Sequence, residues 1–260
     1  MISYCIAAYR HRYAAALIEE LHNKTSVPYE TLVWVNGPGE GLISFIDAKR
    51  AEGVPVEVVG YSPDNIGMNA YRELFLKAAY DLIVQIDDDV LLVSREIAQR
   101  AADIFDRHPN VKQLVADVWQ DEFTTGARPS ISMYSSINEQ DGLMDGPIDG
   151  WFSVYHRSIM PVLLEAPYER YFYLGSFVRE KLRLSGLHGL LCQRMKVFHA
   201  CGPIYAKMFG YLDWEIAKYK SVGNEGMVKA YESVKVRKLK MKEIYQRLSE
   251  VVVLLEGFKG

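Results

Sequence analysis

Short apolar stretches alternate with helix-like segments along the first half of the chain. Runs rich in β-branched residues favour strands, and apolar residues that recur every three or four positions favour helices. Strands are predicted over residues 2–8, 31–36, 56–60, 82–86 and 111–118, and helices over 13–22, 42–52, 68–79 and from a cap at Ser94 to just before Pro109. This order is typical of a mostly parallel sheet flanked by helices. The apolar run LIVQI at 82–86 indicates a strand that is buried on both faces.

The second half of the chain is less regular. Residues 119–149 are largely polar and contain glycines, and an exposed strand is predicted over 130–138 (SISMYSSIN). Two further strands are expected over 150–156 and 195–199, with a helix over 175–185 between them. Strands and helices therefore mix here without a regular alternation.

A final helix is predicted from about residue 225 to residue 255. It combines an apolar stripe with a basic cluster upstream of it; the stripe is Ile244, Leu248, Val252 and Leu255, and the cluster is Lys235, Arg237, Lys238, Lys240 and Lys242. Two interpretations stay open. The helix packs on the domain, because runs of charge usually form solvated faces, or it contacts a membrane surface or a second subunit as a basic amphipathic segment.

Length and composition fit one large domain. Of the 260 residues, 49% are hydrophobic and 12% are aromatic, so the chain can bury a sizeable core. We therefore expect a single Rossmann-like α/β domain with a mostly parallel central sheet flanked by helices. Its two halves are residues 1–118 and 119–224, and residues 225–260 form a C-terminal helical extension.

Charge, cysteines and the N-terminus narrow the possible functions. The net charge of -3 and the pI near 6.1 give no reason to expect nucleic acid as a partner. Cys5, Cys192 and Cys201 have no CxxC spacing, so we expect reduced thiols. The N-terminus lacks the charged start and cleavage site of a signal peptide, and no segment approaches the roughly 20 apolar residues of a membrane span. We therefore expect a cytoplasmic protein that acts on small molecules.

Three adjacent carboxylates, Asp87, Asp88 and Asp89, follow the buried strand at 82–86. Each like-charge pair costs about 1–4 kcal/mol near a protein surface, so something should offset the repulsion. In extended chain Asp87 and Asp89 project to one side and Asp88 to the other. The first and third carboxylates can therefore share a hard cation, Mn²⁺ or Mg²⁺, at the sheet edge where α/β proteins bind ligands. The alternative is an acidic turn without a ligand.

The run from Asn65, NIGMNAYRELFLKAAYDLIVQIDDD, resembles the family 2 glycosyltransferases, which have the A-type glycosyltransferase fold. Their pattern here is Asn-x-Gly, an Ala three residues on, a helix ending in Ala, and a strand closing with Asp-x-Asp. The matching residues are Asn65, Gly67, Ala70, Ala78, Asp87 and Asp89, whereas Arg72 and Leu74 stand where the family often has Asn and Gly. The resemblance implies that residues 1–118 bind a nucleoside diphosphate sugar, with Asn65, Gly67, Arg72, Asp87 and Asp88 among the contacts.

The opening segment, ISYCIAAYRHR, resembles the family's first strand and the turn that cups the nucleoside. Tyr9 is kept in that turn, and the resemblance places Ala8, Tyr9 and Arg10 beside the nucleotide. Where the second strand usually ends in an Asp near the base, this chain has Asn36. The substitution keeps a hydrogen-bonding side chain and removes its charge, so the identity of the base stays open.

Downstream, residues 150–157 (GWFSVYHR) resemble the acceptor-side segment of the family, and 181–199 resemble its closing helix, strand and His. In some relatives that His completes the metal shell, which makes His199 the third metal candidate beside Asp87 and Asp89; the alternative is a histidine without a ligand role. The resemblance covers about residues 2–200.

The acidic pair that inverting members usually carry before the closing helix is replaced by Leu174 and Gly175. Asp149, Glu169 and Glu180 are the carboxylates nearby. No dedicated base is evident, and each of the three can be a surface or structural acid, because such residues are seldom buried or functional without partners. Among them Asp149 is the first candidate for a catalytic base, because it precedes the acceptor-like segment, and Glu180 is the second.

The resemblance implies transfer of a sugar to an acceptor hydroxyl, on a glycan or a lipid-linked molecule. The missing acidic pair leaves a second possibility, a member of the same fold that binds a nucleotide or a glycan without catalysis. A nucleotidyltransferase would need a Gly-rich phosphate loop after the first strand, and AAYRHR has none. A phosphatase with an Asp nucleophile usually carries its motif on the first strand with a Thr soon after, and here Val90 and Leu91 follow the aspartates.

Overall fold

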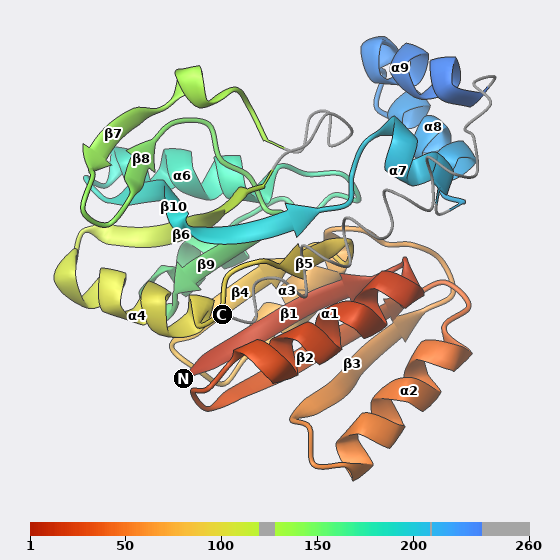
Figure 1. The fold of residues 1–260 in the computed structure, drawn as a ribbon, viewed down its shortest axis with the longest axis horizontal. Coiled ribbons are helices and arrows are strands. Elements are labelled where there is room, and N and C mark those ends of the chain that lie inside the picture. Colours follow the sequence, from red (N-terminus) through yellow and green to blue (C-terminus); the bar gives the residue numbers. More distant parts are fainter. Residues whose placement is uncertain (120–127, 209, 236–260) are drawn as a thin grey trace.

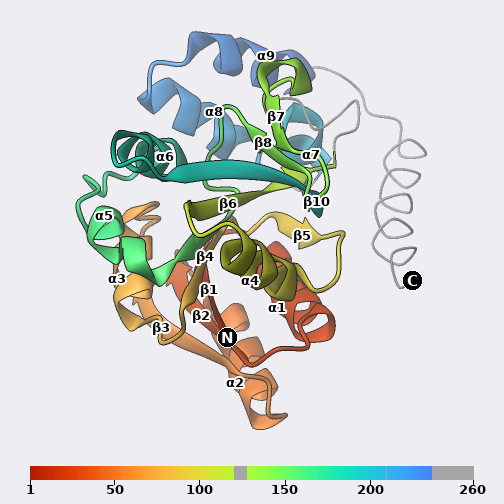
Figure 2. The same ribbon diagram turned by 90° about the vertical axis from the view of Figure 1, so that its left-hand side faces the viewer.

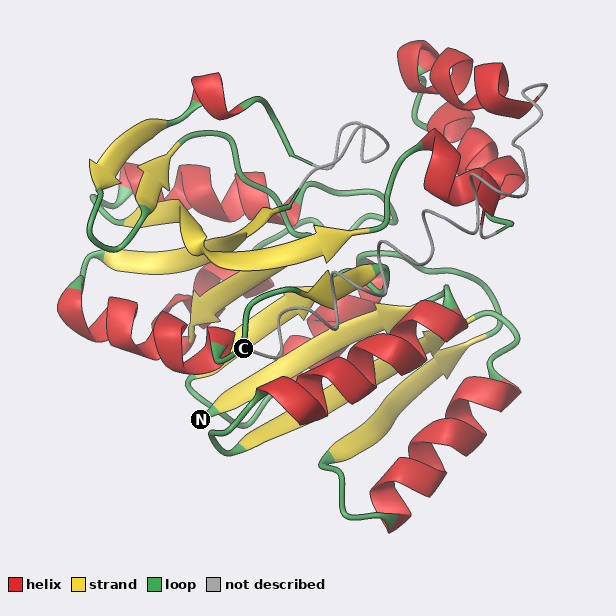
Figure 3. Ribbon diagram, viewed as in Figure 1, coloured by secondary structure: helices red, strands yellow, loops and turns green. Residues whose placement is uncertain are grey.

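The computed structural model describes residues 1–119, 128–208 and 210–235. The described residues form one mixed sheet of ten strands with helices on both faces (Figures 1 and 3). The strands are β1 (Ile2–Ala8), β2 (Tyr29–Asn36), β3 (Val56–Ser62), β4 (Leu82–Ile86), β5 (Val90–Leu92), β6 (Val111–Val118), β7 (Ser135–Asn138), β8 (Leu143–Asp145), β9 (Phe152–His156) and β10 (His188–His199). The helices are α1 (His11–Lys24), α2 (Glu40–Ala51), α3 (Asn69–Lys77), α4 (Ile97–Arg107), α5 (Met160–Leu164), α6 (Leu174–Leu184), α7 (Pro203–Met208), α8 (Leu212–Ser221) and α9 (Glu225–Lys235), with short 3₁₀ turns at Ile131–Met133 and Arg157–Ile159. The predicted α/β class is confirmed.

The helices cover the two faces of the sheet in two groups (Figure 2). Helices α1, α2 and α4 bury apolar side chains such as Leu17 against one face, and α3, α5 and α6 bury side chains such as Phe75 against the other. Along β1, Ile6 belongs to the first apolar cluster and Cys5 to the second, as the alternation of a strand requires. All five residues of β4 are buried, which confirms the prediction of a strand covered on both faces.

The direction of the strands brings six carboxyl ends to one edge of the sheet. Strands β3, β2, β1 and β4 lie side by side in this order and run parallel. Strand β9 is antiparallel to both β4 and β6, and β10 is parallel to β6. Strands β1 to β4, β6 and β10 therefore point the same way, and open α/β sheets bind ligands at such an edge.

Ser94 does not cap α4 as predicted. Its hydroxyl oxygen accepts a hydrogen bond of 2.9 Å from the amide of Lys196, so it ties the segment after β5 to β10. Helix α4 begins instead at Ile97, after Glu96 in the left-handed region at φ 55°. The Ser94 hydroxyl therefore cannot cap α4, because it already accepts the hydrogen bond from β10.

The strand predicted over residues 130–138 is shorter than expected. Only the last four residues form β7, and a 3₁₀ turn closed by a hydrogen bond from the amide of Met133 to the carbonyl of Ser130 precedes it. Tyr134 then turns inward and donates to the carbonyl oxygen of Pro147. The tertiary contact of this one ring shortens the strand.

Within the described part of the chain, three helices follow β10 and pack on one another. Ile204 of α7, Ile216 of α8 and Tyr231 of α9 share one apolar cluster. Helix α9 agrees with the start of the helix predicted from residue 225, whereas α7 and α8 were not predicted. The apolar stripe and the basic cluster beyond Lys235 lie outside the described residues. Among the residues that are described, no helix has the length and the apolar content to cross a bilayer.

Gly67 provides a test of backbone packing next to α3. It has φ +57°, and an added Cβ would lie 2.0 Å from the carbonyl oxygen of Arg170. Gly53 also has positive φ, +89°, but a Cβ there would meet nothing within 4 Å. We expect Gly67→Ala to lower the free energy of unfolding by about 1–3 kcal/mol more than Gly53→Ala, because strain and overlap add. Urea unfolding measures both variants, and equal losses would show that the contact with Arg170 contributes nothing.

Candidate active site

Asp87, Asp88 and Asp89 form a tight turn at the carboxyl end of β4. The amide of Asp87 donates to the carbonyl of Trp151 at 3.0 Å, and the amide of Val90 returns to the carbonyl of Asp87 at 3.1 Å. Asp88 and Asp89 are 3% and 2% exposed, whereas the side chain of Asp87 is 37% exposed. The three carboxylates thus lie at the ligand-binding edge, with Asp87 the most accessible.

His199 joins this turn from the end of β10. Strand β5 pairs antiparallel with β10 and sets Val90 opposite His199, and the amide of Ala200 donates to the carbonyl of Asp89 at 2.9 Å. Asp87, Asp89 and His199 each offer one ligand atom, and these atoms all lie within 4.8 Å of one another. The three residues named as metal candidates from the sequence are therefore brought together.

The donor atoms of this group fit a divalent cation. His199 Nε2 lies 3.2 Å from Asp89 Oδ1 and 3.7 Å from Asp87 Oδ2. Beyond this contact with His199, Asp89 Oδ1 is buried and has no hydrogen-bond partner in the described structure. A buried carboxylate oxygen with so little compensation is costly, and a metal ion would stabilise it. Two carboxylates and an imidazole suit Mn²⁺, and carboxylates also suit Mg²⁺.

Asp88 has a different role from its two neighbours. Its Oδ2 accepts hydrogen bonds from the amides of Tyr9 at 2.6 Å and Arg10 at 2.5 Å, and thereby holds the turn after β1. The guanidinium of Arg10 lies 3.4 Å from Asp88 Oδ1 and also pairs with Asp89 Oδ2. Arg10 therefore offsets the repulsion between the buried carboxylates. Ala8 is fully buried in the core.

The carboxylates of the turn differ in acidity. The pKa of Asp87 is raised to about 7, chiefly by burial and also by the negative charge of Asp89, against the opposing charges of His199 and Arg10. Burial would also raise the pKa of Asp89, but Arg10 and His199 hold it below its ordinary value. Asp89 is thus the more acidic carboxyl of the pair.

Asp149 lies at the same edge, at the start of α6. Because β9 pairs Phe152 with Ile86, the residues just before β9 lie beside the end of β4. Asp149 Oδ1 accepts hydrogen bonds from the amides of Gly150 at 2.8 Å and Gly175 at 3.2 Å. Burial raises the pKa of this carboxyl to about 6, although the amide donors act in the opposite direction.

Glu180 lies on the outer side of α6. Both of its carboxylate oxygens bind Arg183, at 2.9 and 2.7 Å, and its side chain is 54% exposed. It lies more than one helical turn from Gly175, whose amide contacts Asp149. This position favours Asp149 over Glu180 as the reactive carboxylate.

Asn36, Asn65 and Gly67 support the loop between β3 and α3. Asn36 is 1% exposed, and its Oδ1 accepts from the amide of Ile66 at 3.1 Å. Asn65 Oδ1 accepts from the amide of Gly67 at 2.8 Å. The Oδ1 atoms of both asparagines accept hydrogen bonds from backbone amides of this loop. These two side chains therefore fix the conformation of the loop at the sheet edge.

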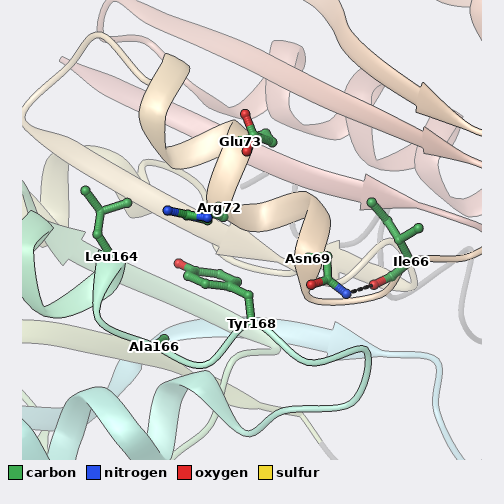
Figure 4. A pocket seen from close by; sticks show the side chains of 7 residues that line it. All are labelled: Ile66, Asn69, Arg72, Glu73, Leu164, Ala166 and Tyr168. Atoms are coloured by element: carbon green, nitrogen blue, oxygen red, sulfur yellow. Dashed lines mark hydrogen bonds between the residues drawn. The ribbon is translucent and has the colours of Figure 1, made fainter.

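Arg72 projects from α3 into a separate cavity of about 570 Å³ between α3 and the segment after α5 (Figure 4). The residues that line this cavity are Ile66, Asn69, Arg72, Glu73, Leu164, Ala166 and Tyr168. The ring of Tyr168 lies on the opposite wall from Arg72 (Figure 4). The described residues do not place Arg72 in contact with the carboxylate turn.

Two residues of α8, which the sequence did not single out, lie against the opening turn. The ring of Trp214 stacks on that of Tyr9, with centroids 4.9 Å apart and an interplanar angle of 26°. The ammonium of Lys218 lies 5.3 Å from the centre of the Trp214 ring. No motif or clear periodicity in LDWEIAKYKS marks these two side chains.

No protein family matches this sequence, and no curated protein does either. Solved structures do match the fold. A mannosyltransferase from Pyrobaculum calidifontis, solved with GDP-Man and Mn²⁺, is 12% identical with a TM-score of 0.60, over 99% of this chain and 81% of that one. TarS 1–349 of S. aureus, solved with UDP-GlcNAc, is 10% identical with a TM-score of 0.56, over 98% and 81% of the two chains.

A third solved structure is glucosyl-3-phosphoglycerate synthase from Mycobacterium tuberculosis, which is 16% identical with a TM-score of 0.51, over 78% of this chain and 73% of that one. At such identities the likeness concerns the fold. The sheet order, the acidic turn after β4 and these structural matches together show that the chain has the A-type glycosyltransferase fold.

Proposed function

We propose that the protein transfers a sugar from a nucleoside diphosphate sugar to a hydroxyl of a glycan or lipid-linked acceptor, with the help of a divalent metal. The observation that carries this proposal is the group of Asp87, Asp89 and His199 at the carboxyl edge, in which a buried oxygen of Asp89 has no hydrogen-bond partner in the described structure beyond its contact with His199. Two proteins of the same fold support it, since one was solved with GDP-Man and Mn²⁺ and the other with UDP-GlcNAc.

The donor would lie along the carboxyl edge of β1 and β4. Asp87, Asp89 and His199 would hold Mn²⁺ or Mg²⁺, which when bound supplies positive charge to the departing diphosphate. Asp88 fixes the turn that presents Tyr9 to the base, through its hydrogen bonds to two amides. Arg10 brings a second positive charge to the same place. The chain thus orients the nucleotide with a rigid turn rather than with a glycine-rich loop.

Asp149 would act as the base that activates the acceptor hydroxyl. With a pKa of about 6 the carboxylate is mostly ionised at neutral pH and is still basic enough to accept a proton. Its hydrogen bonds to the amides of Gly150 and Gly175 hold it at the start of α6, where the acidic pair of inverting relatives is replaced by Leu174 and Gly175. A base in this position favours an inverting transferase over a protein that only binds its ligand.

The proposal is tested by titrating UDP and GDP into the protein in a calorimeter, with and without Mn²⁺, and by following diphosphate release from a panel of nucleotide-sugars. We expect Mn²⁺ to tighten the binding of at least one nucleotide. A matching nucleotide-sugar should release its diphosphate slowly without acceptor, since water can replace the hydroxyl. Equal affinities with and without Mn²⁺, together with no release, would contradict a metal-dependent transferase.

A further inference from the structure

Helix α8 lies on the edge of the sheet where the nucleotide is proposed to bind. Its Trp214 stacks directly on Tyr9, the residue expected beside the base. Gly37 also lies near the Tyr9 ring, since a Cβ added to Gly37 would lie 3.4 Å from one of the ring carbons. Tyr9 thus has Trp214 stacked on one face and Gly37 close by.

Trp214 does not pack in the apolar cluster that joins α7, α8 and α9, and its ring contacts lie instead around the turn after β1. Ile216 and Leu212 of the same helix belong to the apolar cluster that joins α7, α8 and α9, but Trp214 does not. The guanidinium carbon of Arg10 lies 5.7 Å from the centre of the Trp214 ring, and the ammonium of Lys218 lies 5.3 Å from it. Both distances are within the range of cation–π attraction.

Charge also draws α8 toward the carboxylate turn. Lys218 has Glu215 as its carboxylate partner, at 3.5 Å, and the negative charge of Asp89 acts on its ammonium as well. Glu215 is 8% exposed and acts in turn on Arg10. Lys218 and Glu215 of α8 therefore interact electrostatically with the acidic turn and with Arg10.

The stacking of Tyr9 and Trp214 leaves no layer for a further ring. Parallel aromatic rings in contact have centroids about 4.5–7 Å apart when offset, and these two lie near the lower end of that range, at 4.9 Å. A base that stacked on the same face of Tyr9 would have to occupy the place of the indole. The indole thus fills the layer that a nucleobase would need on this face of Tyr9.

We propose that Trp214 occupies the place of the nucleobase on Tyr9 and that nucleotide binding displaces the indole from this ring. This inference rests on the proposed function, because it takes a nucleotide as the ligand at Tyr9. It assigns α8, which lies beyond the segment whose sequence resembles the glycosyltransferase family, to the donor site.

The experiment compares the native chain with Trp214→Ala and Trp214→Phe, using UDP, GDP and inorganic pyrophosphate as probes in the presence of Mn²⁺. Removal of the indole removes a stacked pair and a cation–π contact that the base must break. Trp214→Ala is expected to bind a nucleoside diphosphate about fivefold to tenfold more tightly, and pyrophosphate with affinity unchanged within about twofold. Trp214→Phe keeps a ring and should remain close to the native chain.

Asp213→Ala is the matched control on the same helix. Asp213 is 82% exposed and pairs with Lys235, so its loss should leave all three affinities as they are. In the native chain, nucleotide binding should also change the tryptophan emission, and Trp214→Phe should abolish that change although three other tryptophans remain. The emission measurement uses only the native chain and Trp214→Phe, so it still tests the inference if Trp214→Ala fails to fold.

Equal or weaker nucleotide binding by a folded Trp214→Ala would overturn the inference, and so would an emission change that persists in Trp214→Phe. The proposed function fails in a different way. If neither UDP nor GDP binds the native chain or any variant in Mn²⁺, the site does not take a nucleotide, and the role of Trp214 falls with it.

Discussion

Replacing Asp149 with Asn is expected to lower the rate of sugar transfer by about 10²–10⁴-fold, the usual contribution of a positioned general base. The amide oxygen of Asn can still accept the hydrogen bonds from Gly150 and Gly175, so α6 should keep its start and the protein its fold. Nucleotide affinity should not change, because the metal group is intact. The measurement is kcat and nucleotide Kd for both forms, with the nucleotide-sugar identified in the release assay.

The pH dependence of the transfer rate shows whether Asp149 acts as a general base or has only a structural role. Its pKa is about 6, above the ordinary value of 3.8, so the native rate should fall as pH is lowered through about 6, where the carboxylate takes up a proton. Asp149→Asn should lose this limb of the profile. Glu180→Gln on α6, the helix whose start contacts Asp149, is the control, and its rate should stay native. Equal losses in both variants, or a limb that survives in Asp149→Asn, would contradict the assignment.

Replacing Asp89 with Asn is expected to remove the Mn²⁺-dependent part of nucleotide binding and to slow turnover roughly 100-fold or more, since a carboxylate ligand contributes several kcal/mol to charge stabilisation at the metal. Asp89 is chosen because Arg10 and His199 keep it ionised and because its Oδ1 has no other partner in the described structure. Calorimetry with and without Mn²⁺ measures the loss.

Two further variants show whether the loss concerns the metal. Asp89→Asn also weakens the pairing with Arg10, so its fold must be checked by circular dichroism. Asp87→Asn removes the other carboxylate of the group, which Arg10 does not pair with, and should show the same loss of Mn²⁺ dependence. Asp145→Asn removes an accessible carboxylate that pairs with Arg179 and should behave like the native chain. Unchanged Mn²⁺ dependence in both site variants would exclude this metal group.

The elements that the sequence predicted well are those with a strong local pattern. The run at Leu82–Ile86 is continuously apolar, and the three aspartates after it mark the end of the strand, so this part of the site was evident before the fold. Strand β5 has only three residues, too few for a periodicity to show. Its pairing with β10 is nevertheless what brings His199 to the aspartates.

Other parts of the site depend on tertiary contacts. Asp149 could be named from its place before the acceptor-like segment, but its contact with the start of α6 appears only in the fold. The exposed position of Glu180 could have been predicted from the pattern alone. The buried positions of α6 include Leu174, Val178 and Leu182, four residues apart, and Glu180 lies between the last two on the other side of the helix.

Helix α8 was not predicted from the sequence because its pattern of apolar and polar residues is weak. Its apolar and polar residues are not segregated to two faces, because it packs on α7 and α9 and also covers the turn after β1. A helix with partners on several sides loses the periodicity by which helices are recognised. For this reason neither Trp214 nor Lys218 could be assigned to the site from the sequence.

The pairing of β5 with β10 has a consequence for how the protein reaches its native state. The candidate metal ligands come from opposite halves of the chain, and they meet only after β10 has paired with β5 and β6. Contacts between such distant segments form late and slowly, since a long loop must close first. The acidic turn can therefore acquire its third ligand only in an essentially complete fold, and a cation bound there would raise the melting temperature of the whole domain rather than of one half.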